Sequence, residues 1–326
     1  MLKLKLKTVN WPLRTPFRIA GQVMLDVPVI QLQLQDDDSH CGHGEAAGID
    51  YDGETAESMC AQLNAIANKL SNELGGDDVL KLLPRGGARN ALDCALLDLR
   101  AKQSGLSVAE QIGVANAALP CIYTIGLGDA QELEQQIAIA EQYDTIKVKV
   151  DACDCIARVT QIRQIFPLKT LLIDANQAWT IEQLKALMPG LHALEVTLIE
   201  QPLPRNGDEA LCHLERRIPI AADESCTDRH SLTSLVGKYD YINIKLDKCG
   251  GLTEALVMAK QAQAMGFKLM VGNMCGSSLA MAPAFYLGQL CELHDLDGPL
   301  LQSDDTAPVM RFSGGKIYAP ESELWG

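Results

Sequence analysis

Charged side chains follow short apolar runs at five regularly spaced points of the chain. They are Lys149, Asp174, Glu200, Asp223 and Lys245. Carboxylate oxygens are the ligands that Mg²⁺ prefers, and three crowded carboxylates without a cation would repel one another. Taken singly, each residue is better explained as a solvated loop residue or a helix cap, but the shared spacing of all five favours one common site. The residues therefore predict a magnesium site flanked by two lysines.

These residues belong to a longer series of apolar runs that predicts the fold. The runs end 22 to 27 residues apart, at Thr124, Lys149, Asp174, Glu200, Asp223, Lys245, Gly272 and Asp297. A strand, a loop, a helix and a return loop need about that many residues, and helical patterns lie between the runs, for example over 131–142 and 253–265. Eight strands in this order predict an α/β fold of the TIM-barrel type, whose strand ends meet at one mouth.

The two lysines are expected on opposite sides of that mouth. Lys149 and Lys245 end the second and sixth strands, which lie four apart in a ring of eight. Two bases that face one substrate carbon from opposite sides can remove a proton and return it on the other face, which is racemisation or epimerisation. A working lysine base needs a lowered pKa, which a divalent cation and the neighbouring Lys147 would supply; Lys147 is otherwise explained as a supporting cation.

The first hundred residues have a different pattern. Apolar residues alternate with polar ones at Leu2, Leu4 and Leu6 and again over 27–34, on either side of a mixed stretch broken by prolines, which predicts two antiparallel strands joined by a loop. Helical spacing follows in 59–74 and 89–102. This part of the chain is expected to be α+β.

Composition excludes several classes of partner. The 326 residues include 42 acidic and 28 basic ones, for a net charge of −14, with no run rich in Lys or Arg, so nucleic acid and anionic membranes are poor partners. No apolar run reaches about 18 residues, and the start of the chain resembles a strand rather than a signal peptide. The eleven cysteines form no CxxC pair. We expect a soluble cytoplasmic protein with reduced thiols.

Six motifs resemble the enolase superfamily, in its muconate-lactonizing subgroup, and within it the dipeptide epimerases typified by L-Ala-D/L-Glu epimerase. They are IKVKV (146–150), IDAN (173–176), IEQP (199–202), ADES (222–225), INIKLDKCGG (242–251) and DLDGP (295–299). The resemblance implies a (β/α)7β barrel over 116–299 and an α+β capping domain over 1–115, completed by about 300–326. It also implies Mg²⁺ on Asp174, Glu200 and Asp223, with Lys149 and Lys245 as the acid/base pair.

The implied reaction is a 1,1-proton transfer at the α-carbon of the C-terminal residue of a dipeptide, through an enediolate that Mg²⁺ stabilises. A place in the recycling of peptidoglycan peptides would suit such an enzyme. Family members are commonly oligomers, so a homo-oligomer is a further expectation.

The end of the eighth strand bears on the substrate. Asp295 and Asp297 would bind a free α-ammonium, although a turn before Gly298 explains them as well. The resemblance places further residues along the peptide, namely Thr124, Lys147, Asn273, Met274 and Cys275.

One departure concerns the substrate's side chain. Relatives that act on Ala-Glu are expected to supply a glutamate-binding Arg after a Pro-Phe pair, but here the aligned position holds Gly21 or Gln22. Arg18 is a substitute, although a loop Arg is more often merely solvated. The loop over 44–53 is acidic and favours a neutral or cationic side chain.

Three alternatives stay open. A muconate-type cycloisomerase or an N-acylamino acid racemase would use the same five charged residues. A noncatalytic barrel that binds a metal or a carboxylate belongs to another class. A hydrolytic metal barrel is disfavoured, because none of the six histidines ends strands two to six.

Overall fold

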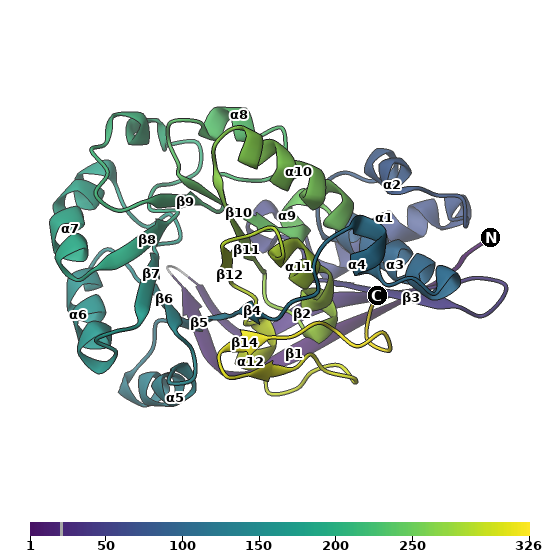
Figure 1. Ribbon diagram of the computed structural model, residues 1–326, viewed down its shortest axis with the longest axis horizontal. Helices are drawn as coiled ribbons and strands as arrows, with labels where there is room; N and C mark the ends of the chain where they lie inside the picture. The colour runs from purple at the N-terminus through teal and green to yellow at the C-terminus, as the bar shows by residue number, and fades with distance from the viewer. Residues whose placement is uncertain (20–21) are drawn as a thin grey trace.

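The computed structural model describes residues 1–19 and 22–326 and contains a parallel barrel of eight strands (Figure 1). Hydrogen-bonded neighbours follow chain order from first to last. The strands are β5 (Ile122–Ile125), β6 (Thr145–Lys149), β7 (Thr170–Asp174), β8 (Val196–Glu200), β9 (Ile220–Ala222), β10 (Tyr241–Lys245), β11 (Lys268–Gly272) and β12 (Leu293–His294). Each apolar run of the sequence forms one of these strands, so the predicted TIM-type fold is confirmed.

Helices surround the barrel on its outer side (Figure 1). These helices are α5 (Ala130–Ala140), α6 (Cys155–Ile165), α7 (Ile181–Ala193), α8 (Leu232–Leu235), α10 (Leu252–Ala264) and α11 (Ser278–Gly288). The single turns α9 (Leu246–Cys249) and α12 (Gly298–Leu301) come just after the ends of β10 and β12. Side chains define several starts: Asp129 accepts hydrogen bonds from two backbone N–H groups at the start of α5, and Thr180 and Gln183 form a capping box on α7. Between β8 and β9 the connection holds only the short 3₁₀ helix η3 (Glu209–His213).

An apolar cluster fills the inside of the barrel beneath its mouth. It consists of Ile122, Leu172, Leu198, Ala221 and Met270. The first four lie two residues before a polar strand-end residue, and side chains two apart in a strand point to the same face. The polar strand-end residues therefore also point inward, one layer above this apolar cluster.

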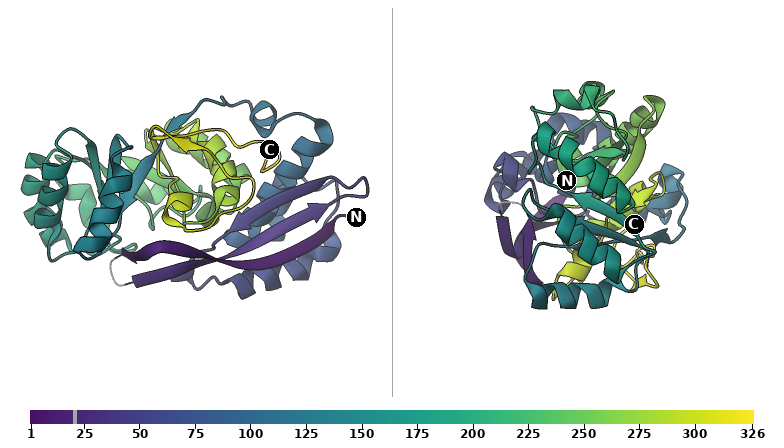
Figure 2. Two further views of the ribbon diagram at one scale, coloured as in Figure 1. Left: turned by 90° about the horizontal axis from the view of Figure 1, so that it is seen from below. Right: turned by 90° about the vertical axis from the view of Figure 1, so that its left-hand side faces the viewer.

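The N-terminal part forms a separate antiparallel sheet with helices (Figure 2). β1 (Lys3–Ile19) pairs antiparallel with β2 (Gln22–Gln35), as predicted, but both strands extend into the mixed stretch that was expected to be a loop. β3 (Cys41–Ala46) adds a third strand that the sequence pattern did not predict. Elements after the sheet are η1 (Asp50–Asp52), α1 (Ala56–Ile66), η2 (Ala67–Lys69), α2 (Gly76–Leu82), α3 (Gly87–Ser104) and α4 (Val108–Ile112).

Glycines in β3 let α3 pack directly on the sheet. A Cβ at Gly42 would lie 2.1 Å from the Ala95 carbonyl oxygen, and one at Gly44 would lie 2.1 Å from that of Ala91. Glycine is a poor strand former, which is why this segment does not look like a strand in the sequence. The close packing of α3 on β3 requires glycine at both positions.

The long β1–β2 hairpin runs along the barrel, and the end of the chain returns to the N-terminal part (Figure 2). A bridge joins Arg18 to Leu127 after β5. A small sheet joins β4 (Leu119–Pro120), β13 (Phe312–Ser313) and β14 (Lys316–Ile317). The Trp325 indole N–H donates to the carbonyl oxygens of His43 and Cys94.

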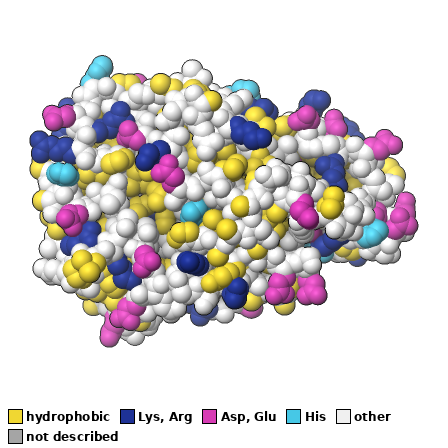
Figure 3. Space-filling view, viewed as in Figure 1, with side chains coloured by type: hydrophobic (Ala, Val, Ile, Leu, Met, Phe, Trp, Pro, Cys, Tyr) yellow, Lys and Arg dark blue, Asp and Glu magenta, His cyan; other side chains and the backbone are white. Residues whose placement is uncertain are grey.

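The surface is mixed in charge. On the face shown in Figure 3, basic and acidic side chains are interspersed. Among the described residues, no helix is both long and apolar enough to cross a bilayer.

Candidate active site

Three carboxylates meet where neighbouring strands end. Asp174 is the last residue of β7, Glu200 is the last of β8 and lies opposite Asp174 in the strand register, and Asp223 directly follows β9. All three are buried, with at most 2% of their surface exposed. The structure therefore brings the three predicted metal ligands to one point of the barrel mouth.

Lysines from both sides reach these carboxylates. Lys149 Nζ lies 2.6 Å from Asp174 Oδ2, and Lys245 Nζ lies 2.7 Å from Asp223 Oδ2. Lys147 Nζ lies 3.7 Å from Asp174 and 3.6 Å from Glu200. The two predicted bases thus stand at opposite ends of the row of carboxylates, and Lys147 stands in the middle.

Burial and charge shift the pKa values in this cluster in opposite directions. Burial raises the pKa of Glu200 to about 7, and the negative charge of Asp174 adds to the shift. Burial acts the same way on Asp223, but Lys245 and Lys248 overcome it and hold the Asp223 pKa far below its ordinary value. Burial lowers the pKa of Lys245, yet Asp223 and Glu200 raise it more. A cation that shared the charge of those carboxylates would bring the Lys245 pKa down again.

Glu200 gives a direct test of whether the cluster fits a divalent cation. Its Oε1 accepts a hydrogen bond of 2.7 Å from the Asn243 amide, whereas its buried Oε2 has no hydrogen-bond partner within residues 1–19 and 22–326. This oxygen lies 3.6 Å from Lys147 Nζ, and a buried carboxylate oxygen without a hydrogen bond is costly. Because β8 lies between β7 and β9, this oxygen belongs to the central member of three carboxylates, a donor set that suits Mg²⁺.

A cavity of ≈280 Å³ opens above the cluster. Both Lys149 and Lys245 line it, together with Asp223, so the two lysines face one shared cavity. Its upper lining comes from the N-terminal part of the chain and contains Phe17, Met24, Asp26, Val27, Pro28, Ala47, Gly48, Asp50 and Tyr51. A small molecule in this cavity would lie between the lysines and beneath the N-terminal sheet.

The predicted ammonium-binding pair is deeply buried beside the cluster. Asp295 and Asp297 are each 2% exposed. Lys147 forms an ion pair with Asp295, and the backbone N–H of Thr124 donates to Asp297 Oδ2 at 2.6 Å. Burial, and then the charge of Asp295, raise the pKa of Asp297 to about 6. One carboxylate of the pair is thus paired with a lysine, and the other has a backbone donor.

Phe17 borders this end of the site. It lines the main cavity and also a second cavity of ≈90 Å³, which Tyr123 and Thr124 line from the barrel. The aromatic ring therefore stands where the acid/base end of the site adjoins the end that holds the two aspartates.

The loop after β11 also reaches the cavity. Asn273 donates to the Asp295 carbonyl oxygen at 2.6 Å and accepts from the Cys275 N–H at 2.7 Å, while Met274 Sδ lies 3.9 Å from Lys245 Nζ. All three loop residues line the main cavity. Thr124 and Lys147, the other predicted substrate contacts, lie deeper, against Asp295 and Asp297.

Arg18 points elsewhere. It forms an ion pair with Glu132 on α5, and no arginine is among the described residues that line the main cavity. Gly21, one of the two positions that align with the glutamate-binding Arg of relatives, lies outside the described residues, as does the side chain of Gln22, the other position. Asp26 and Asp50 instead add negative charge to the described lining.

Several residues of the site were not predicted. Lys248 Nζ donates to Asp223 Oδ1 and to the Asp223 carbonyl oxygen, both at 2.5 Å, and Asn176 Oδ1 accepts from Lys149 at 3.0 Å. Glu224 lines the main cavity. Asn176, Glu224 and Lys248 lie within the IDAN, ADES and INIKLDKCGG motifs, and Asn243 precedes Lys245 by two residues and so points to the same face of its strand.

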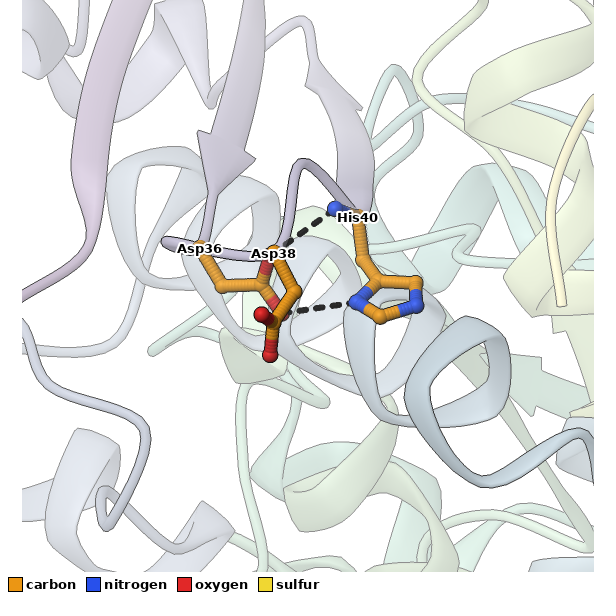
Figure 4. Close-up of side chains that lie close together, drawn as sticks. All are labelled: Asp36, Asp38 and His40. Atoms are coloured by element: carbon orange, nitrogen blue, oxygen red, sulfur yellow. Dashed lines mark hydrogen bonds and ion pairs between the residues drawn. The ribbon is translucent and has the colours of Figure 1, made fainter.

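A second acidic cluster lies in the N-terminal part of the molecule (Figure 4). Asp36, Asp38 and His40 occupy the turn between β2 and β3, and their ligand atoms lie within 4.8 Å of one another. Asp36 accepts from the His40 N–H at 2.8 Å and from Gln103 at 2.8 Å. These hydrogen bonds account for the cluster as the scaffold of a turn.

Family models match nearly the whole chain. Residues 1–113 match the model described as "Mandelate racemase / muconate lactonizing enzyme, N-terminal domain", and residues 129–323 match "Enolase C-terminal domain-like".

Two curated relatives are similar over most of their length. An N-acetyl-D-glutamate racemase from a Pseudoalteromonas species is 43% identical over 85% of this chain and 88% of its own. The L-Ala-D/L-Glu epimerase of Escherichia coli K12 is 38% identical over 94% of this chain and 97% of its own.

Solved structures agree in fold. An enolase family member from Agrobacterium tumefaciens, described as having homology to dipeptide epimerases and holding sodium and L-Ala-L-Glu, matches with a TM-score of 0.96 and 37% identity over 100% of both chains. A dipeptide epimerase from Methylococcus capsulatus, complexed with Mg and L-Arg-D-Lys, matches with a TM-score of 0.90 and 28% identity over 98% of this chain and 97% of that one.

Proposed function

Because this chain belongs to the enolase superfamily, in the group of mandelate racemase and muconate lactonizing enzyme, we propose that it is a Mg²⁺-dependent dipeptide epimerase. The enzyme class is isomerase. One observation carries the proposal: Lys149 and Lys245, from strands four apart in the barrel, line one cavity beside three buried carboxylates.

The reaction is a proton transfer at the α-carbon of the C-terminal residue. One lysine takes the α-proton from one face, and the other, which carries a proton, delivers it to the opposite face. Asp174, Glu200 and Asp223 would hold the metal, and bound Mg²⁺ supplies electrostatic stabilisation of the enediolate formed between the two transfers. Asn176 holds Lys149 in place, while Lys147 balances the charge of the deeper carboxylates.

The amino end of the dipeptide would lie at Asp297. An ammonium there would meet the buried carboxylate of Asp297. The neighbouring Asp295 is already paired with Lys147, which balances its charge. The hydrogen bond between an ammonium and this carboxylate is charge-assisted, and it is strong in a buried site. This end of the site favours a substrate with a free amine.

A second candidate is an N-acylamino acid racemase. It is favoured by the 43% identity to the N-acetyl-D-glutamate racemase, which exceeds the 38% identity to the L-Ala-D/L-Glu epimerase. An N-acyl substrate has no ammonium for Asp297 to bind. The two candidates share the lysines and the metal ligands and differ only at the amino end.

Deuterium uptake tests the proposal. The protein is incubated in D₂O with a library of dipeptides and, in parallel, with N-acetyl amino acids, each with Mg²⁺ or with a chelator. We expect α-deuterium in one or more dipeptides, only with Mg²⁺, and no uptake by Lys149→Met/Lys245→Met, which keeps the chain lengths and removes both amines. Uptake restricted to N-acetyl amino acids would establish the second candidate, and no uptake in either class would refute both.

A further inference from the structure

The chain that follows Lys245 is held by the N-terminal part of the molecule. Asp247 Oδ1 accepts the Gly48 N–H at 3.1 Å, and the Asn90 side chain on α3 lies near enough to Asp247 to lower the pKa of its carboxyl. Arg89 on the same helix donates to the Gly250 carbonyl oxygen at 3.1 Å and to that of Cys249 at 2.5 Å. These contacts join residues about 160 to 200 positions apart in sequence.

Lys245 stands at the start of this held segment. It is both the last residue of β10 and the N-cap of the single turn α9, so any shift of α9 moves its backbone. The segment also has no room to shift toward α3: a Cβ at Gly250 would lie 2.4 Å from Arg89 Nε, and one at Gly251 would lie 2.5 Å from Asp93 Oδ2.

Lys149 is supported differently. Its ammonium donates to Asp174 and Asn176, and its carbonyl oxygen accepts from Arg158 Nε at 3.1 Å, all of which belong to the barrel. The two lysines therefore depend on different parts of the molecule for their positions.

Burying the Asp247 carboxyl at this place costs free energy. It is 6% exposed, and burial raises its pKa to about 7 although the Gly48 hydrogen bond opposes the shift. A buried carboxyl costs free energy that an apolar side chain would not cost. A role in holding two segments in register explains its presence.

We propose that Asp247 is a positioning residue that fixes Lys245, but not Lys149, against the loop containing Gly48. The inference rests on the proposed function, because it assigns the two lysines to opposite faces of the substrate. Asp247 would thus govern one of the two proton transfers. Gly48 lines the main cavity. The hydrogen bond from its N–H to Asp247 therefore joins the chain just after Lys245 to the segment above the substrate.

The test follows deuterium exchange separately from the two isomers of one substrate that the wild-type protein turns over. Single variants Lys149→Met and Lys245→Met first assign which isomer exchanges through which lysine. In Asp247→Ala, exchange through Lys245 is expected to fall about tenfold to a hundredfold, the usual cost of a small misplacement of a reacting group, while exchange through Lys149 stays within about twofold. Epimerisation falls with the slower transfer.

Controls separate this role from a general loss of structure. Thr253→Val removes the 2.6 Å hydrogen bond from Thr253 to Asp93 at the same junction with α3, eight residues after Lys245, and is expected to leave the ratio of the two exchange rates unchanged. If Asp247→Ala does not fold, Asn90→Ala removes a polar neighbour of Asp247 on α3 and should show a smaller asymmetry in the same direction. An equal fall for both isomers, or no change, would overturn the inference. Absence of exchange in the wild-type protein would instead refute the proposed function.

Discussion

Replacing Asp297 with asparagine tests the amino end of the site most directly. The side chain is buried, and the Thr124 N–H donates to its Oδ2 at 2.6 Å. An asparagine oxygen can accept the same hydrogen bond, so the variant keeps the shape of the site and removes the charge. Lys147 remains paired with Asp295. The perturbation is therefore confined to the charge that an incoming ammonium would meet.

The magnitude follows from the loss of one charge-assisted hydrogen bond. Such bonds contribute about 1.5–3 kcal/mol, and each 1.4 kcal/mol is about a factor of ten, so kcat/KM for a dipeptide should fall about 10- to 140-fold. An N-acetyl amino acid with the same C-terminal residue serves as the internal control, since it has no ammonium and its kcat/KM should not fall. Both values are measured on one preparation by following epimerisation. Full dipeptide activity in Asp297→Asn would refute the reasoning.

Three further outcomes are expected. Chelation should abolish exchange, and Mg²⁺ at about a hundred times its Kd should restore it and add about 2.7 kcal/mol of stability, seen as a rise in Tm. Trp325→Ala should lower the free energy of unfolding by about 3–5 kcal/mol in urea titrations, because the fully buried ring and its two hydrogen bonds are lost, whereas Trp325→Phe should cost less. Gly44→Ala should cost about 1–3 kcal/mol in the same assay, because its Cβ would overlap the Ala91 carbonyl oxygen.

The barrel and its strand-end residues could be predicted because they repeat. Asp174 and Glu200 each end an apolar run, and the spacing between runs is that of a strand with its helix and loops. Alternation along a strand then predicts which way each side chain points: Leu172 and Leu198, two residues earlier, lie in the apolar cluster inside the barrel, so Asp174 and Glu200 also point inward. A period in the sequence thus carried three-dimensional information.

Other features carried no such local signal. β3 was missed because Gly42 and Gly44 serve the packing of α3 rather than strand propensity. Lys248 looks like any polar residue of a short helix, yet only 1% of its surface is exposed and it holds Asp223. The hydrogen bond between Gly48 and Asp247 spans 199 positions. Contacts of this kind arise only when the N-terminal part and the barrel meet.

The protonation state of Asp297 separates the two candidate substrate classes. Its pKa of about 6, raised by burial and by Asp295, means that the carboxyl is ionised above that pH and neutral below it. A dipeptide ammonium needs the ionised form, so its KM should rise about tenfold per pH unit below 6. An acyl carbonyl oxygen needs a donor, which only the protonated carboxyl provides, so the KM of an N-acetyl substrate should fall over the same range. Other groups that titrate in the free enzyme affect both substrates alike and cancel in the ratio of the two KM values. A ratio that does not change between about pH 5 and about pH 8 would show that Asp297 touches neither substrate.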